Sequence, residues 1–64
     1  MWVEVKRTKS LMIAQMWHDC FEGEGIPTRV MPVNGLPEGR ELDDYKVLVP
    51  QDKVHVIDEV LRKL

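Results

Sequence analysis

The sequence predicts a small α+β domain with the element order β-α-β-β-α, and three observations predict it. Three segments alternate apolar and polar residues with the period of two that half-buried strands show. Two others repeat apolar residues at the i, i+3, i+4, i+7 spacing of a helix that buries one face. The length of 64 residues leaves room for one domain, 1–64, and a core this small predicts modest stability.

The first strand and the first helix come from the N-terminal third of the chain. The segment 2–8 alternates valines with polar or bulky residues and is the first strand. From Ser10 the spacing becomes helical, and an apolar stripe covers about 160° of arc, with Trp17 near its centre and therefore expected in the core. Thr8 or Ser10 is expected to cap the helix. The stripe consists of Ile13, Ala14, Met16, Trp17, Cys20 and Phe21.

The stretch FEGEGIPTRV, residues 21–30, joins this helix to the second strand. Gly23 or Gly25 is expected to end the helix in the left-handed conformation, which glycine adopts without penalty. A phosphate-binding loop is the alternative, but such loops follow a strand and open a helix, whereas these glycines do the reverse. Because Pro27 lacks an amide proton, the second strand is predicted at the sheet edge. One face of this strand is expected to carry Ile26, Thr28 and Val30, and the other Arg29, Met31 and Val33.

The second half of the chain contains a loop, a strand and a helix. Residues 34–44 are rich in glycine and proline and show no apolar period, so they are expected to connect two strands. The segment 45–50 alternates tyrosine and valine with lysine and leucine and is the third strand. Helical spacing then returns, with Asp52 near the start and Arg62 near the end, where each suits the helix dipole. The apolar residues of this last helix are Val54, Ile57, Val60, Leu61 and Leu64.

The element order also predicts the sheet. Strands joined by a helix run parallel through a right-handed crossover, so we expect a three-stranded mixed sheet of order 1-3-2 with both helices packed on one face. The covered face is expected to carry Val3, Val5, Ile26, Val30, Val47 and Val49. The opposite face carries Trp2, Met31, Val33 and Leu48 among Glu4, Lys6, Arg29 and Lys46. Because it is too apolar for a merely solvated surface, its four apolar residues are interface candidates.

Composition narrows the class of protein. Nine basic and eleven acidic residues, spread along the chain for a net charge of -2, are not the electrostatic design for binding nucleic acid or an anionic membrane, so we expect neither partner. An apolar share of 44% predicts a folded domain rather than a disordered one. Cys20 is the only cysteine, which excludes an internal disulfide and predicts a reducing, cytoplasmic location. No segment resembles a signal peptide or a membrane span.

Three stretches carry a resemblance to a known family: the short first strand, a helix ending FEGEGIP, and the closing YKVLVPQDKVHVIDEVLRKL. Together they resemble very small prokaryotic domains that are assigned to signal transduction and have no established activity. These look like shortened relatives of the ferredoxin-like fold of the PII nitrogen-regulatory proteins. The resemblance implies that fold and a regulatory role, and it transfers no catalytic residue. In the larger PII-like proteins the connection matching residues 34–44 is the effector loop, although here it is longer and more acidic than in commoner members of the small family.

His18, Cys20 and His55 are the residues of this sequence that suggest a metal site or a thiol nucleophile. His18 and Cys20 point about 200° apart on a helix, so they cannot converge on one ion. Cys20 falls within the apolar stripe, where a thiol behaves as a small hydrophobic residue. We interpret Cys20 as structural and both His18 and His55 as surface or boundary residues, and we predict no metal or cofactor.

The loop 34–44 suggests two further sites. Its acids, including Glu38, could bind calcium or magnesium, but the ordered spacing of an EF-hand is absent, which favours a solvated loop. Arg29 and Arg40 flank the loop and either grip a small anionic metabolite by forked hydrogen bonds or pair with neighbouring acids. The remaining charged residues of the loop are Glu41, Asp43 and Asp44.

The sequence contains no catalytic triad, metal cluster or nucleotide fingerprint, so we predict no catalytic residues and no enzyme. The leading hypothesis is a non-enzymatic regulatory or protein-interaction module that is homodimeric through the open sheet face or a strand edge, because an apolar patch and a small core both favour a partner. The alternative is a sensor in which the loop 34–44 closes over an anionic ligand held by Arg29 and Arg40.

Overall fold

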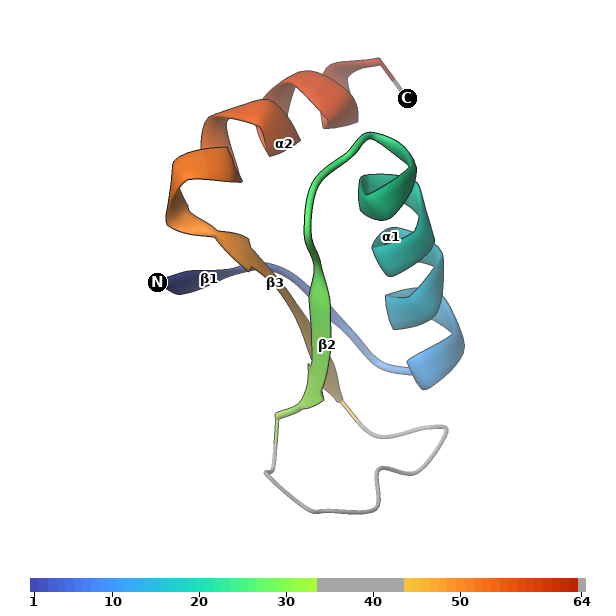
Figure 1. Ribbon diagram of the computed structural model, residues 1–64. Coiled ribbons are helices and arrows are strands. Elements are labelled where there is room, and N and C mark those ends of the chain that lie inside the picture. The colour runs from blue at the N-terminus through green and yellow to red at the C-terminus, as the bar shows by residue number, and fades with distance from the viewer. Residues whose placement is uncertain (34–43, 64) are drawn as a thin grey trace.

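A computed structural model describes residues 1–33 and 44–63 of the chain, so the predicted loop lies outside the described residues except for Asp44. The elements confirm the predicted order and the α+β class (Figure 1). They are β1 (Trp2–Thr8), α1 (Leu11–Gly23), β2 (Arg29–Pro32), β3 (Tyr45–Pro50), the short 3-10 turn η1 (Gln51–Lys53) and α2 (Val54–Arg62). No helix in these two segments is long and apolar enough to cross a membrane.

The strands form one three-stranded sheet in the predicted order β1-β3-β2. Both β1 and β2 pair antiparallel with β3, which corrects the predicted mixed sheet. The outer strands do run in the same direction, as a helix crossover between them requires, but β3 lies between them. Every hydrogen-bonded pair of strands is therefore antiparallel.

A β-bulge in β1 changes which side chains share a face. Glu4 and Lys6 pair with consecutive residues of β3, so Val5 between them has no partner of its own. Beyond the bulge the alternation is shifted by one residue, and Lys6 lies on the face that the helices cover. Its Nζ is 4.7 Å from the centroid of the Trp17 ring in α1. The prediction that Lys6 lies on the uncovered face is therefore wrong.

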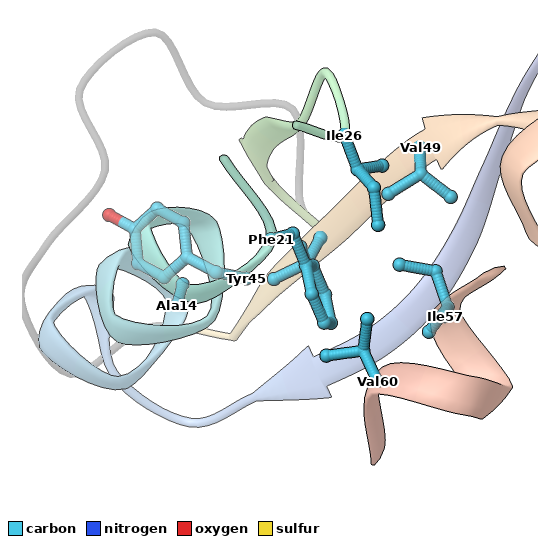
Figure 2. Close-up of a cluster of buried hydrophobic side chains, with 8 residues drawn as sticks. Ala14, Phe21, Ile26, Tyr45, Val49, Ile57 and Val60 are labelled. Carbon is cyan, nitrogen blue, oxygen red and sulfur yellow. The ribbon is translucent and has the colours of Figure 1, made fainter. Parts of the chain in front are cut away.

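The core lies between the sheet and the two helices. Three residues alternate along β3 and are buried beneath both helices, which confirms that the helices cover one face of the sheet. Figure 2 shows Phe21 of α1 in the middle of the cluster, with Ile57 and Val60 of α2 on one side. The buried apolar residues are Ala14, Phe21, Ile26, Tyr45, Val47, Val49, Ile57 and Val60.

The first turn of α1 is capped as the sequence predicts. Ser10 accepts a hydrogen bond at its Oγ from the backbone N–H of Ile13 at 3.2 Å, which satisfies one of the free amides of the helix. Thr8, the other candidate, is buried and donates its hydroxyl to the Ser10 carbonyl oxygen at 2.9 Å. Ser10 is therefore the N-cap, and the hydrogen bond from Thr8 fixes the backbone just before the helix.

The last turn of α1 ends in a Schellman motif. Gly25 has φ of 81°, in the left-handed region, whereas Gly23 is the last helical residue. The N–H of Ile26 donates to the Phe21 carbonyl oxygen, and the N–H of Gly25 donates to that of Glu22, each at 3.0 Å. The side chains of Ile26 and Phe21 are both buried in the core, which supplies the apolar contact typical of this motif.

α1 buries only one edge of its predicted apolar stripe. Ala14 and Phe21 are fully buried, whereas Trp17, which the sequence placed in the core at the centre of the stripe, is half-buried and packs against the core only in part. The small side chain of Ala14 lets the helix approach the sheet closely, and the large ring of Trp17 is accommodated at the side. Other apolar residues of α1 expose much of their surface: Met12 65%, Ile13 46% and Met16 64%.

β2 is shorter than the alternation predicts. The backbone N–H of Thr28 donates to Oε2 of Glu22 at 2.8 Å, so the chain before Arg29 is held by α1 rather than by the sheet. Ile26 and Thr28 are nevertheless buried, on the inner side where the sequence places them. At the other end, the N–H of Val33 donates to the Asp44 carbonyl oxygen at 3.0 Å.

Candidate functional site

The side of the sheet opposite the helices is not covered by any described element. The strand register places eight residues on this side, and we call them the open face. They form the rows Arg7, Lys46 and Met31; Glu4, Leu48 and Arg29; and Trp2 with Pro50. Three predicted interface residues therefore share one surface: Trp2, Met31 and Leu48. Val33, the fourth, follows β2 and is half-buried at the border of this surface.

A stacked pair crosses the open face. The Arg29 guanidinium carbon lies 4.2 Å from the centroid of the Trp2 ring, within the range of a cation–π interaction. Because Trp2 is in β1 and Arg29 in β2, the two side chains meet across β3. Arg29 forms no ion pair with any described residue. A predicted interface residue and a predicted ligand-binding residue thus belong to one site, whereas Arg40 lies outside the described residues.

An ion pair occupies the other end of β1. Arg7 donates from Nη2 to Oε1 of Glu4 at 3.0 Å and from Nε to Oε2 at 3.1 Å. These hydrogen bonds lower the pKa of the Glu4 carboxyl, aided by the charges of Arg7 and Lys46, and raise the pKa of the Arg7 guanidinium. Residues three apart in a regular strand point to opposite faces, and only the bulge at Val5 brings these two together. Sequence reasoning missed Arg7 for that reason.

The open face has a positive balance although the whole chain is negative. It carries Arg7, Arg29 and Lys46 against Glu4, and Asp44 lies near enough to Arg7 to raise its pKa further. Arg7 is neutralised by Glu4, whereas Arg29 and Lys46 are in no ion pair within the described segments. The surface therefore combines apolar side chains with two cations that are available to an anionic group.

A second apolar surface lies on α1. Ile13, Met16, Trp17 and Cys20, spaced i, i+3, i+4 and i+7, line a hollow, and we call them together with the neighbouring Met12 the α1 seam. Cys20 is a free thiol that packs partly against the core. The sequence placed Ile13, Met16, Trp17 and Cys20 in one apolar stripe with Ala14 and Phe21, because it could not tell which edge of the stripe faces the sheet. Met12 was not part of that stripe.

The two histidines lie on different helices, His18 on α1 and His55 on α2. His18 is half-exposed, with Nδ1 3.2 Å from Oδ1 of Asp19 and Nε2 3.9 Å from Oε2 of Glu22. His55 is exposed on α2. Within residues 1–33 and 44–63, no group of three or more histidine, cysteine or acidic side chains is placed to hold a metal ion. Except for Asp44, the loop acids lie outside the described residues, so their solvated state stays a prediction.

Comparisons of this chain with protein-family models, with curated proteins and with solved structures found no match. The open face and the α1 seam are therefore the basis for inferring a function.

Proposed function

We propose that this chain is a non-enzymatic regulatory or protein-interaction module whose open face binds another protein. The observation that carries the proposal is the Trp2–Arg29 stack on an uncovered sheet, flanked by Leu48 and Met31. Tryptophan and arginine, together with tyrosine, are enriched among the residues that dominate binding energy at protein interfaces. A contiguous apolar surface rimmed by polar side chains is typical of such interfaces.

The charge of the open face favours an acidic protein over a second copy of this chain. The sequence suggested self-association through this face or a strand edge. Two copies packed face to face would bring two positively balanced surfaces together, which is unfavourable. The strand edges are also poor sites for pairing, because β2 is flanked by Pro27 and ends at Pro32, while β1 is bent by its bulge. Acidic side chains of another protein would instead meet Arg29 and Lys46.

The fold supports a regulatory role by analogy. A split β-α-β unit followed by a strand and a helix suits a shortened ferredoxin-like, PII-like domain, the fold of the small signal-transducing proteins that the sequence resembles. We include signal transduction in a prokaryotic cytoplasm in the proposal. The cytoplasmic location rests on Cys20, a free thiol with no second cysteine in the sequence.

Capture of a partner by matched variants tests this function. The immobilised chain is incubated with extract of its native cell, and bound proteins are quantified by mass spectrometry. We expect Trp2→Ala and Arg29→Glu to lower recovery of the specific partner at least about tenfold, as loss of an interface anchor does. Glu59→Lys, an exposed change on α2, is the control and should bind normally. Equal recovery by all variants, or recovery of nucleic acid in place of protein, would contradict the proposal.

A sensor of small anions is the second candidate, because Arg29 is positioned by Trp2 and has no carboxylate partner among the described side chains. A bound ligand at concentration [L] stabilises the folded state by RT ln(1 + [L]/Kd), so nucleotides and organic acids should raise the Tm. We expect Arg29→Gln to abolish any such rise. A broad panel at millimolar concentration that leaves the Tm unchanged would exclude this candidate.

A further inference from the structure

We propose that the α1 seam joins two copies of this chain, with their α1 helices packed antiparallel about a two-fold axis. This inference goes beyond the proposed function and uses a different surface, since the open face lies on the other side of the sheet. Three seam residues, Met12, Ile13 and Met16, expose between 46% and 65% of their surface. Their spacing is that of a stripe that packs against another helix.

The order of side chains along the seam suits pairing with a second copy of itself. An axis midway between Met16 and Trp17 places Met16 of one copy opposite Trp17 of the other. The same axis places Ile13 opposite Cys20 of the second copy, so a larger side chain meets a smaller one at both ends. A two-fold interface requires this reciprocity, because each contact occurs twice. Lys6 covers one side of the Trp17 ring and supports it.

The charges at the two ends of α1 favour a second, antiparallel copy as the occupant. α1 has no acidic residue in its first turn and no basic residue in its last turn. Instead, Lys9 precedes the N-terminus of α1, and Glu24 follows its last helical residue. Each charge has the same sign as the partial charge of the helix dipole at that end, which is unfavourable. Both side chains are exposed and in no ion pair within the described chain. In the antiparallel pair, Lys9 of each copy lies beside Glu24 of the other, and the two helix dipoles also oppose one another favourably.

The size of the seam predicts a weak, reversible dimer. A stable interface buries about 800 Å² on each partner, against a total accessible surface of 4530 Å² for this chain. A helix of 13 residues is only about 20 Å long and covers less than that area. We therefore expect association in the micromolar to millimolar range, which sedimentation equilibrium measures directly.

Disulfide cross-linking tests the register. On the proposed axis the two Cys20 residues are about 10 Å apart along the helices, beyond the reach of a disulfide, so the natural chain should not cross-link under mild oxidation. Ile13→Cys places a thiol opposite Cys20 of the second copy and should give a covalent dimer. Adding Cys20→Ser to that variant should abolish the product. Cross-linking of the natural chain, or equal cross-linking of the double variant, would overturn the antiparallel register.

Charge reversal at the ends of α1 and a matched pair of glutamate substitutions on its two sides complete the test. Lys9→Glu and Glu24→Lys should each weaken the dimer about tenfold, because each turns two attractive pairs into repulsive ones, and the double reversal should restore it. Met16→Glu should abolish the dimer, whereas Gln15→Glu, an exposed change on the polar side of α1, should not. A chain that stays monomeric at millimolar concentration overturns the proposal. Trp2→Ala and Arg29→Glu should leave the dimer intact. The test of the dimer is therefore independent of the test of partner binding by the open face.

Discussion

The two helices cover the same face of the sheet, but their sequences meet different demands. In α2 the described apolar residues are buried or half-buried, and Arg62 in the last turn complements the helix dipole. Asp52 lies in η1, directly before α2, and Lys53 is the N-cap of the helix. In α1 three apolar side chains are exposed, and both termini carry charge of the unfavourable sign. The apolar residues of α2 are used by the core of the domain, whereas α1 keeps Met12, Ile13 and Met16 exposed to solvent. That difference separates residues that maintain the fold from residues available to a partner.

The largest expected effect on the free energy of unfolding comes from the core residues that both helices contribute. Phe21→Ala in α1 and Ile57→Ala in α2 should each lower the free energy of unfolding, by about 3–5 and 2–5 kcal/mol respectively, because each empties a fully packed site. Urea denaturation at low protein concentration measures both values. A cost below about 1 kcal/mol for either variant would show that its helix is not anchored as described.

The two glycines at the end of α1 should differ in how much their replacement by alanine lowers the free energy of unfolding. Gly25→Ala should cost about 1 kcal/mol, because a β-carbon is penalised at the φ of 81° that closes α1. Gly23→Ala should be neutral or slightly stabilising, since no atom lies within 4 Å of the added carbon. α2 ends at Arg62, and its C-cap residue Lys63 has a right-handed φ of -82°, so this end needs no glycine. Equal effects in the two glycine variants, measured by urea denaturation, would contradict the assigned end of α1.

Neutralising a charge at the C-terminal end should change the free energy of unfolding in opposite directions in the two helices. For the monomer in low salt, Glu24→Gln in α1 should raise the free energy of unfolding, whereas Arg62→Gln in α2 should lower it, each by about 0.3–1 kcal/mol. Thermal denaturation at dilute concentration measures both changes, and high salt should reduce them. Two changes of the same sign would remove the contrast between the helices.

The smallest expected effect is on the α1 seam. Met16→Ala should change the free energy of unfolding of the monomer by less than about 0.5 kcal/mol, as exposed substitutions do, even though methionine is apolar. Chemical denaturation at a concentration far below that of any dimer is the measurement. A loss comparable to that of Phe21→Ala would place Met16 in the core and leave α1 without an exposed seam.

Local features of the chain were predictable because they depend on neighbours in sequence. The periods of two and of 3.6 located the strands and helices, and the Ser10 cap and the glycine pair marked the ends of α1. The helix crossover predicted the strand order correctly. The predicted mixed sheet was wrong, because both outer strands pair antiparallel with β3. Trp2, Leu48 and Met31 were correctly grouped on one surface, since each lies on a strand segment whose alternation is regular.

The sequence by itself determined the class, the element order and the residues that begin and end α1, because short-range spacing and backbone preferences govern these features. Only the tertiary structure decided which edge of the α1 stripe faces the sheet, since Ala14 and Phe21 are fully buried in the core and Trp17 is buried only in part. It also decided, through the bulge at Val5, that Lys6 lies under α1 and Arg7 on the open face. An unpaired residue shifts every later side chain to the other side of a strand, and only pairing with β3 reveals it.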